Sequence, residues 1–505
     1  MMHLPLLPVL VPLAAAILML ALHRADIRLA RGIALVSVGG LAVVAVLLLR
    51  QAAGGTVAVV ALGNWPAPFG IVFVADRLAA LMVATTVAIA VPALLAACGG
   101  IDRGGRHFHP FFQMQLAGLN GAFLTGDLFN LFVFFELLLI ASYGLLVHGG
   151  GAARVRAGLH YVVLNLAGSV LFLIGLGLLY GTLNLADVAE RLATVPPGDA
   201  APLRVALALL VAVFALKAAL LPLGFWLPHA YGAASAPAAA LFAVLTKVGI
   251  YALVRLSSVA FDAAPGAGLF SPWLLPMALA TVAVATAGVL AARRLAAMVA
   301  HLLLLSTGML AAALAEGGMP MLAALLYYLP HTTLVSAALF LLVGRIAAAR
   351  GEAGDRLIRS ARMPGDAWLG TAFLVLAVAV SGLPPLSGFL GKLMMLSAAP
   401  ATAAGYVLWA VFILSGFVAA LGLARAASTL FWERGRVEVP LVPAAGRAAT
   451  WALLLALGCV PALVLGAAPL SAYARATAEQ LAARQPYLQA VLPGGVAAVA
   501  REVRP

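Results

Sequence analysis

Residues 128–147 read LFNLFVFFELLLIASYGLLV, an apolar run whose single acidic or basic side chain is Glu136. A helix of about 20 apolar residues is long enough to cross a hydrocarbon core about 30 Å thick. A carboxylate at such a depth is costly to insert, so it marks a functional site by default. The stretch therefore predicts a membrane-spanning helix with a functional acid near its middle. The alternative is a permanently protonated glutamate that bonds a neighbouring carbonyl group.

Runs of this kind recur along the whole chain. Of its 505 residues, 65% are hydrophobic and only 9% are charged, whereas an ordinary soluble domain has about 25% charged residues. The sequence thus predicts an all-α polytopic membrane protein with about fourteen transmembrane helices. The expected spans are residues 4–22, 29–49, 72–98, 107–125, 128–147, 157–180, 203–228, 235–256, 272–292, 295–315, 319–343, 367–399, 402–430 and 448–470.

The arginines indicate how these spans are oriented. Eighteen arginines lie in or beside the connections that follow odd-numbered spans, and five lie at the connections that follow even-numbered spans. Because cytoplasmic connections carry an excess of basic residues, both termini are expected on the outer side of a bacterial plasma membrane. The same arginines account for the net charge of +13. No basic stripe with aromatic partners occurs, so nucleic acid is not an expected partner.

The lysines are placed differently from the arginines. The chain has 30 basic residues, and its three lysines, Lys217, Lys247 and Lys392, all lie inside expected spans. Arginine keeps its proton at any relevant pH, whereas burial lowers the pKa of a lysine from about 10.4 by up to about 3–5 units. A buried lysine can therefore bind and release a proton near pH 7. Snorkelling toward the membrane surface is the alternative, but it does not suit Lys247, which lies near the middle of its span.

Histidines supply further candidates for proton transfer. His331 lies within YYLPHTTLVSAALFLL, directly after Pro330, and an ordinary histidine pKa near 6.5 suits proton transfer. A hydrogen-bonded core residue is the alternative interpretation. His301 also lies inside a span, and His229 follows a WLP turn where it would line a proton uptake path. These two histidines are secondary candidates.

Two of the expected spans are interrupted. Lys217 is followed by AALLPLGFWLP, and Lys392 is preceded by SGLPPLSGFLG. Proline removes a backbone donor and glycine loosens a helix, so breaks at membrane depth need protein or water to satisfy the freed backbone groups. The broken spans are the seventh and the twelfth, which run in opposite directions. This arrangement predicts an inverted repeat of spans 4–8 and 9–13.

The chain is accordingly divided into five regions. Residues 1–106 are expected to form peripheral helices, 107–256 and 272–432 the two repeats, 446–470 the last span and 471–505 a C-terminal tail. For the tail the sequence leaves two possibilities open, an amphipathic helix on the outer surface and a frayed end.

Several stretches resemble one family of transporters. Residues 119–149, LNGAFLTGDLFNLFVFFELLLIASYGLLVHG, are similar to the D-type subunit of the Mrp-type multisubunit cation/proton antiporters, a relative of the antiporter-like subunits of respiratory complex I and of membrane-bound hydrogenases. ALKAALLPLGFWLP, LFAVLTKVGIYALVR and SGLPPLSGFLGKLMML resemble the family's seventh, eighth and broken twelfth helices. The WLPHAY segment departs from complex I subunits, which usually carry an aspartate after the proline, and this departure favours the Mrp branch.

The resemblance implies a role for each candidate residue. Glu136 matches the fifth-helix glutamate and Lys217 its seventh-helix lysine partner. Lys247 matches the eighth-helix lysine, His331 falls where the family places an eleventh-helix relay group, and Lys392 matches the twelfth-helix lysine. The resemblance also implies that the chain works within a hetero-oligomeric complex.

The expected function is therefore proton translocation within a multisubunit Na⁺/H⁺ or K⁺/H⁺ antiporter, along a relay in the middle of the membrane. One alternative is a proton-pumping subunit of a redox-driven complex, and another is an assembly scaffold without transport of its own. No nucleotide loop, nucleophile–base pair or metal-ligand spacing occurs, so neither a cofactor nor enzymatic chemistry is expected. The sequence leaves open which cation is exchanged and whether it passes through this subunit.

Overall fold

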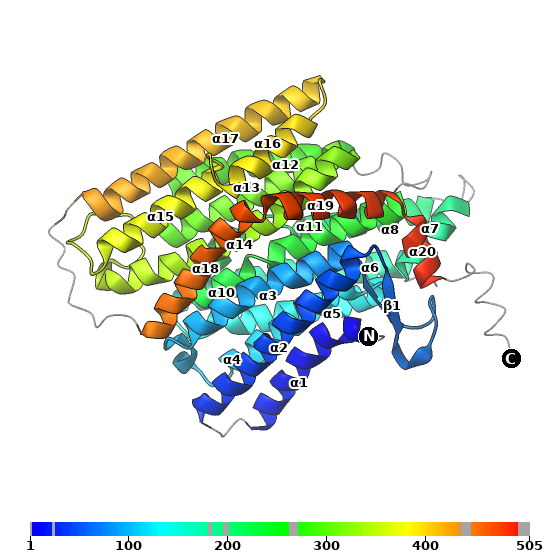
Figure 1. Ribbon diagram of the computed structural model, residues 1–505, viewed down its shortest axis with the longest axis horizontal. Coiled ribbons are helices and arrows are strands. Elements are labelled where there is room, and N and C mark those ends of the chain that lie inside the picture. Colours follow the sequence, from blue (N-terminus) through cyan, green and yellow to red (C-terminus); the bar gives the residue numbers. More distant parts are fainter. Residues whose placement is uncertain are drawn as a thin grey trace.

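The computed structural model describes residues 3–22, 26–179, 184–194, 201–261, 271–433, 435 and 446–492. These residues form a bundle of helices, most of which run side by side along one direction (Figure 1). One end of the bundle carries a β-hairpin, and we call it the hairpin end. The other end carries the tip of the α1–α2 hairpin of helices, and we call it the opposite end.

Helices that are long and apolar make up most of the bundle. Eleven helices of the described chain have the length and composition needed to cross a membrane. Their ranges are Leu4–Ala21, Ile27–Ala53, Arg77–Ala97, Leu128–Val147, Ala152–Leu178, Ala236–Val259, Pro272–Ala291, Leu295–Glu316, Met319–Ala349, Ala403–Trp432 and Arg447–Leu465. The three remaining expected spans correspond to the shorter helix α4 and to two interrupted helices. The number of fourteen membrane crossings stays a prediction.

The helical elements follow the expected order along the chain. In the first half they are α1 (Leu7–Ala21), α2 (Ile27–Ala53), α3 (Arg77–Ala97), α4 (Phe108–Leu124), α5 (Leu128–Val147), α6 (Ala152–Leu178), α7 (Leu185–Thr194), α8 (Ala201–Lys217), α9 (Trp226–Ala233), α10 (Ala236–Phe242) and α11 (Leu245–Leu256). In the second half they are α12 (Ser271–Ala291), α13 (Leu295–Glu316), α14 (Met319–Ala349), α15 (Asp366–Ser381), α16 (Ser387–Ala398), α17 (Ala403–Ala427), α18 (Arg447–Leu465), α19 (Ala467–Ala482) and α20 (Gln485–Val491).

Both expected interruptions are present. The seventh span consists of α8 and α9, and the twelfth consists of α15 and α16. The eighth span, expected as one helix, contains a local irregularity, because α10 ends at Phe242 and α11 begins at Leu245. A hydrogen bond of 2.9 Å from the backbone nitrogen of Lys247 to the carbonyl oxygen of Val244 closes a tighter turn there. This turn places Lys247 at the start of α11.

The third expected span was wrong at its start. Residues Val72–Ala75 form strand β2, which pairs antiparallel with β1 (Ala58–Ala61). Asp76 then starts α3, because its carboxylate accepts a hydrogen bond of 2.9 Å from the backbone nitrogen of Ala79. A short apolar run suits a buried strand as well as a helix, so its periodicity did not separate the two.

The C-terminal segment is helical as far as Val491. Helices α18 and α19 meet at Gly466 and lie end to end across the bundle (Figure 1). Helix α19 packs along α14 through a buried face that includes Ala474, Thr477 and Leu481. The tail is thus part of the packed structure through residue 492, and residues 493–505 lie outside the described chain.

Candidate functional site

Lys217 is the last residue of α8, and its side chain is buried where that helix breaks. Helix α11 approaches this point closely, because a Cβ atom at Gly249 would lie only 2.4 Å from the backbone nitrogen of Ala218. The Lys217 Nζ atom lies 5.5 Å from the centre of the Phe135 ring. Among the residues that the structure describes, the Lys217 ammonium group has no hydrogen-bond partner.

A small cavity of about 20 Å³ adjoins Lys217. Tyr161 and Asn165 of α6 line it together with Lys217, while most of the other lining side chains are apolar. A cavity of this size holds about one water molecule, provided that polar partners are available. The cavity is therefore suited to a single water beside the ammonium group.

Helix α6 presents a polar stripe to this region, formed by Tyr161, Asn165 and Ser169 at intervals of four residues. The Ser169 hydroxyl donates a hydrogen bond to Oε1 of Glu136. The Tyr161 hydroxyl lies 2.7 Å from the Ser142 hydroxyl of α5, and Asn165 borders the cavity between them. This α6 stripe thus contacts the acid at one end and lines the lysine cavity at the other.

Glu136 lies on α5 and is half-buried. It is close enough to Lys217 to act on it electrostatically. No ion pair joins the two side chains, both of which the structure describes. The acid and the lysine are therefore electrostatic neighbours without direct contact.

Lys247 is 0% exposed and lies in the first turn of α11. Its Nζ atom donates hydrogen bonds to Ser306 Oγ at 3.2 Å and to Thr307 Oγ1 at 3.0 Å, both on α13. Both hydroxyls donate to the carbonyl oxygen of Leu303, so they act as acceptors toward Lys247, and the ammonium group and the neutral amine both keep N–H donors for them. These partners therefore suit Lys247 with or without its extra proton.

Lys392 lies on α16, just after the second break. Its Nζ atom donates a hydrogen bond of 2.7 Å to the carbonyl oxygen of Ser381, the last residue of α15. One of the backbone carbonyls freed by the interruption is thereby satisfied. Gly382 leaves room for this contact: its φ is 78°, and a Cβ atom there would lie 2.6 Å from Cδ of Lys392.

His331 of α14 packs against the same break. Its Nδ1 atom lies 2.8 Å from Oγ of Ser387, the first residue of α16. A Cβ atom at Gly388 would lie 2.8 Å from Nε2 of His331, so the glycine makes room for the ring. Lys392 is close enough to act on His331 electrostatically. Two predicted residues therefore meet at the second break.

The secondary candidates His229 and His301 line one cavity of about 190 Å³. His229 is exposed on α9, and His301 is partly buried on α13. Leu221, Gly224 and Phe225 from the first break complete part of the lining. The two histidines are thus brought together beside the interruption that follows Lys217.

The five main candidates do not form a continuous chain of direct contacts. In the described chain no hydrogen bond joins Lys217 to Lys247, or Lys247 to His331. Each lysine or acid instead lies beside hydroxyl groups, a backbone carbonyl or a small cavity. Proton passage between successive candidates therefore requires intervening water.

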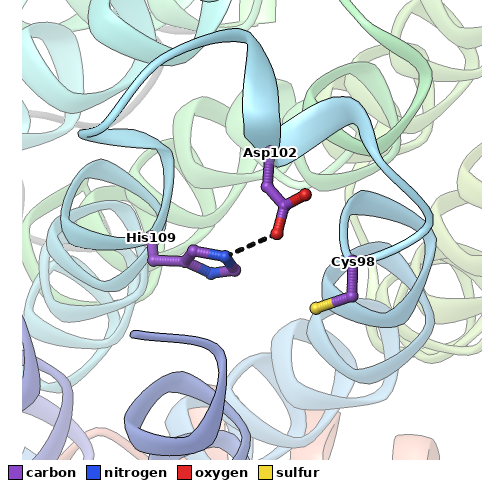
Figure 2. Close-up of side chains that lie close together, drawn as sticks. All are labelled: Cys98, Asp102 and His109. Atoms are coloured by element: carbon purple, nitrogen blue, oxygen red, sulfur yellow. Dashed lines mark hydrogen bonds and ion pairs between the residues drawn. The ribbon is translucent and has the colours of Figure 1, made fainter. Parts of the chain in front are cut away.

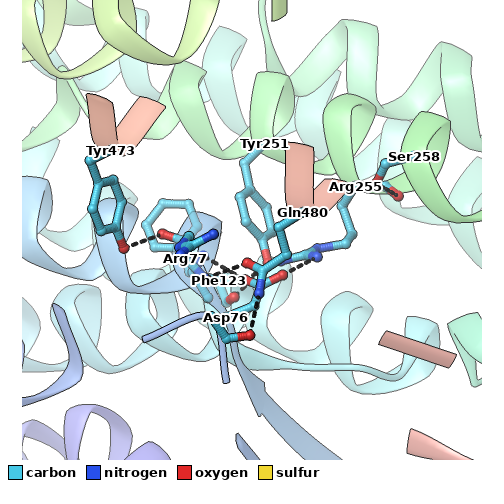
Figure 3. A network of polar contacts seen from close by, with 10 residues as sticks. Asp76, Arg77, Phe123, Tyr251, Arg255, Ser258, Tyr473 and Gln480 are labelled. Atoms are coloured by element: carbon cyan, nitrogen blue, oxygen red, sulfur yellow. Dashed lines mark hydrogen bonds and ion pairs between the residues drawn. The ribbon is translucent and has the colours of Figure 1, made fainter. Parts of the chain in front are cut away.

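One buried charge network was not expected from the sequence. Arg255 of α11 donates to both carboxylate oxygens of Asp76, at 2.6 Å and 2.8 Å, and both side chains are buried (Figure 3). The Tyr251 hydroxyl accepts from Arg255 and donates to the carbonyl oxygen of Phe123 at 2.5 Å. Burial alone would raise the pKa of Asp76, but Arg255 outweighs it and lowers this pKa below its ordinary value.

The C-terminal helices close over this network. Gln480 of α19 accepts a hydrogen bond from the backbone nitrogen of Arg77, and the Tyr473 hydroxyl donates to the carbonyl oxygen of Arg77 (Figure 3). The Tyr487 ring of α20 lies 5.3 Å from the Arg255 guanidinium carbon. In the sequence, Asp76 and Arg255 lie at the ends of apolar runs, which gives no reason to expect a buried ion pair. One signal of burial was available: Arg255 follows Lys247 by eight residues, about two helical turns, and so lies on the same face of the helix.

A second cluster lies at the opposite end of the bundle. Asp102 is bound by Arg31 at 2.7 Å and 2.8 Å, and its Oδ2 atom lies 2.9 Å from Nε2 of His109, with Cys98 nearby (Figure 2). His109 is 2% exposed. Burial raises the pKa of the Cys98 thiol to about 11. With both Asp102 oxygens taken by Arg31, the cluster ties α2 and α4 together and is a poor donor set for a metal.

Known proteins resemble this chain over nearly its full length. The protein family described as "NADH:quinone oxidoreductase/Mrp antiporter, TM" matches residues 125–421, which include all five main candidates and both breaks. The D-type subunit of a probable K⁺/H⁺ antiporter of Rhizobium meliloti is 40% identical, over 97% of this chain and 97% of its own length. The D-type subunit of an Na⁺/H⁺ antiporter of Alkalihalophilus pseudofirmus is 34% identical, over 97% of this chain and 100% of its own length.

A solved structure shows the same fold. A chain in the structure of the Mrp complex from Dietzia sp. superposes with a TM-score of 0.86 at 28% sequence identity. The match covers 97% of this chain and 99% of the other. The arrangement of helices described above is therefore shared with a component of a multisubunit membrane complex.

Proposed function

Since this chain belongs to the NADH:quinone oxidoreductase/Mrp antiporter family, we propose that it is the proton-translocating subunit of a multisubunit monovalent cation/proton antiporter. The observation that carries the proposal is the buried Lys217 beside a water-sized cavity at the first break, with the half-buried Glu136 within electrostatic reach. Relatives at 40% and 34% identity are named as D-type subunits of K⁺/H⁺ and Na⁺/H⁺ antiporters. The chain is a multi-pass membrane protein, and its role is that of a transporter subunit.

The proposed relay begins at Glu136 and Lys217. At about 4 Å and an effective dielectric constant of about 20, an acid and a lysine attract each other by about 4 kcal/mol. When the two side chains meet, the protonated lysine is stabilised; when they separate, burial favours release of the proton. The water-sized cavity beside Lys217 supplies a place for the proton to leave. A modest movement of α5 against α8 would then switch the direction of transfer.

From Lys217 the proposed path continues through Lys247 and His331 to Lys392. Ser306 and Thr307 support both protonation forms of Lys247. His331 and Lys392 share the second break, where Ser387 and the carbonyl of Ser381 hold them. Buried water completes the gaps between successive members. The division into two inverted repeats, residues 107–256 and 272–432, would place the two breaks in equivalent positions.

Uptake of the proton is proposed to occur at the cavity shared by His229 and His301. This cavity has room for several water molecules and borders the first break. With both termini on the outer side, it would open toward the cytoplasm. The exposed His229 would receive the proton first, and His301 would lie behind it.

A second candidate function is proton pumping driven by electron transfer. The family description itself joins NADH:quinone oxidoreductase with Mrp antiporters, which favours keeping this alternative. Both functions use the same relay and differ in the energy source. They are therefore separated by what drives proton movement and not by the residues in the membrane.

The test uses the complete complex in inverted membrane vesicles from antiporter-deficient cells, expressed with its neighbouring subunits. A pre-formed pH gradient is followed while Na⁺, K⁺ or an electron donor is added. The proposal predicts collapse of the gradient on adding one of the cations. The relay variant Lys217→Ala should not show this collapse. Arg447→Gln is its control and should respond like the wild type, because this exposed arginine lies away from the proposed relay. Proton movement that responds to the electron donor and to neither cation would favour the redox-driven function.

A further inference from the structure

A cavity of about 620 Å³ lies at the opposite end of the bundle, away from the proposed relay. It lies between the end of α1, the start of α2 and the segment that leads from the 3₁₀ turn Ile101–Gly104 into α4. Nothing in the proposed proton path uses this space. Its walls combine apolar side chains with charged ones.

The apolar wall comes from helices that are themselves candidates for membrane spans. Met19 and Leu22 belong to the end of α1, and Leu29 and Ile33 to the start of α2. Leu22 is 42% exposed and Leu29 is 46% exposed, so this wall continues onto the outer surface of the bundle. A cavity at the ends of two such helices lies where hydrocarbon gives way to headgroups.

The carboxylates in the lining are already matched by arginines. Arg31 binds both oxygens of Asp102, and His109 contacts one of them (Figure 2). Burial would raise the pKa of Asp102, but these hydrogen bonds outweigh it and lower this pKa to about 2. Asp26 caps α2 through the backbone nitrogen of Arg28 and lies 3.9 Å from its side chain. Asp102 is therefore fully ion-paired, whereas Asp26 is an exposed carboxylate with the exposed Arg28 as its nearest cation.

Two arginines on the rim remain without partners. Arg103 and Arg106 line the cavity and are exposed. Neither guanidinium group forms a hydrogen bond or ion pair with any residue in the described ranges. A guanidinium group matches a phosphate in geometry and charge, and it can bind two of its oxygens at once. The rim therefore offers a phosphate two cationic contacts beside an apolar wall.

We propose that this cavity binds an anionic phospholipid, with the phosphate headgroup at Arg103 and Arg106 and an acyl chain against Met19 and Ile33. Basic pockets between membrane helices are typical sites for anionic headgroups. The volume exceeds what a lone phosphate fills, and the apolar wall gives a chain its place. A zwitterionic lipid would gain less, because its own cation would face the arginines. The inference stands apart from the proton relay and is tested without transport activity.

The test is lipid binding to the purified, delipidated complex, measured by native mass spectrometry during titration with phosphatidylglycerol. The wild type is compared with the double variant Arg103→Gln/Arg106→Gln, and Arg447→Gln at the same end of the bundle is the matched control. Loss of two phosphate contacts predicts that the double variant binds one phosphatidylglycerol about tenfold or more weakly. The control variant should bind like the wild type. Because both rim arginines are exposed and unpaired, the double variant should assemble and melt like the wild type.

Several outcomes would overturn the proposal. Equal binding of phosphatidylglycerol by the wild type and the double variant would exclude the arginines as the headgroup site. Equal binding of phosphatidylcholine would exclude selection for an anionic lipid. Competition by millimolar inorganic phosphate alone would assign the site to free phosphate. Absence of any bound lipid in the assembled wild-type complex would show that a neighbouring subunit fills the cavity instead.

Discussion

The two interrupted helices carry the same elements but use them differently. At the first break Lys217 ends α8, adjoins a water-sized cavity and has Glu136 within electrostatic reach. At the second break Lys392 lies beyond the interruption and binds the carbonyl of Ser381 at 2.7 Å. The nearest titratable neighbour in the second case is His331, a base and not an acid.

From this difference we infer that the two breaks have different roles in proton transfer. If the acid moves toward and away from Lys217 and water fills the cavity, as we propose, the lysine has two distinct electrostatic environments and its proton affinity can be switched. A lysine held by a fixed backbone carbonyl has one dominant environment and changes affinity only through its neighbours. We therefore assign switching to the first break and onward transfer to the second.

The largest expected effect comes from replacing lysine with arginine. Lys217→Arg keeps the charge but does not release a proton, so cation-driven collapse of a pH gradient should fall by about 10²-fold or more, the range of general acid–base groups. Lys392→Arg should cause a comparable loss if the second break also passes protons. Flux through inverted vesicles, normalised to assembled complex, measures both. A normal rate for Lys392→Arg would confine proton transfer to the first half.

Removing the acid should have the next largest effect. Glu136→Gln leaves the shape of the side chain but removes the charge that favours protonated Lys217, and we expect about a tenfold lower rate. Ser169→Ala is the companion variant, because it removes only the hydroxyl that holds Glu136. It should lower the rate about 3–10-fold, the effect of one hydrogen bond. Unchanged rates in both variants would remove the distinction between the two breaks.

At the second break the corresponding variant is Ser387→Ala. It removes the hydroxyl at 2.8 Å from His331 and leaves the ring in place. Because this partner orients the ring without exchanging charge, the rate should fall by about 3–5-fold. The same assay measures the effect, with Ser415→Ala on α17 as the control, since that hydroxyl bonds only within its own helix. A loss as large as that of Lys217→Arg would mean that the switch lies in the second half.

The smallest effect is expected at the water-sized cavity. Asn165→Leu removes the polar wall that would hold water beside Lys217, and the rate should fall by about threefold. Val163→Leu is a matched control on the same helix, because this side chain is 57% exposed on the outer surface. Equal rates for the two variants would show that the cavity carries no proton.

Much of the site was predictable because charges in apolar runs leave few alternatives. The buried positions of Lys217, Lys247 and Lys392 and the two breaks followed from isolated lysines next to proline and glycine. The hydrogen-bond partners of these charged side chains could not be predicted from the sequence. Ser169 and Thr307 come from other helices than Glu136 and Lys247, at separations of 33 and 60 residues, and a hydroxyl group in an apolar helix gives no signal of the side chain that it will contact.

Span ends were the weakest part of the prediction for a different reason. Asp76 and Arg255 lie at the ends of apolar runs, where charged residues are expected to face water. In the folded chain the hairpin and the C-terminal helices cover these ends and bury the ion pair. The sequence shows how apolar a run is. It does not show whether another segment packs over the end of that run, because this packing involves contacts such as Arg77–Gln480, between residues about 400 positions apart.

The central claim is that protons pass through Lys217. It is tested most directly by comparing wild type and Lys217→Ala in inverted vesicles that contain equal amounts of assembled complex. After a pH gradient is formed, Na⁺ or K⁺ is added and the collapse is followed. The account predicts that the wild type dissipates the gradient and that the variant does not. Collapse at the wild-type rate in the Lys217→Ala complex would contradict it.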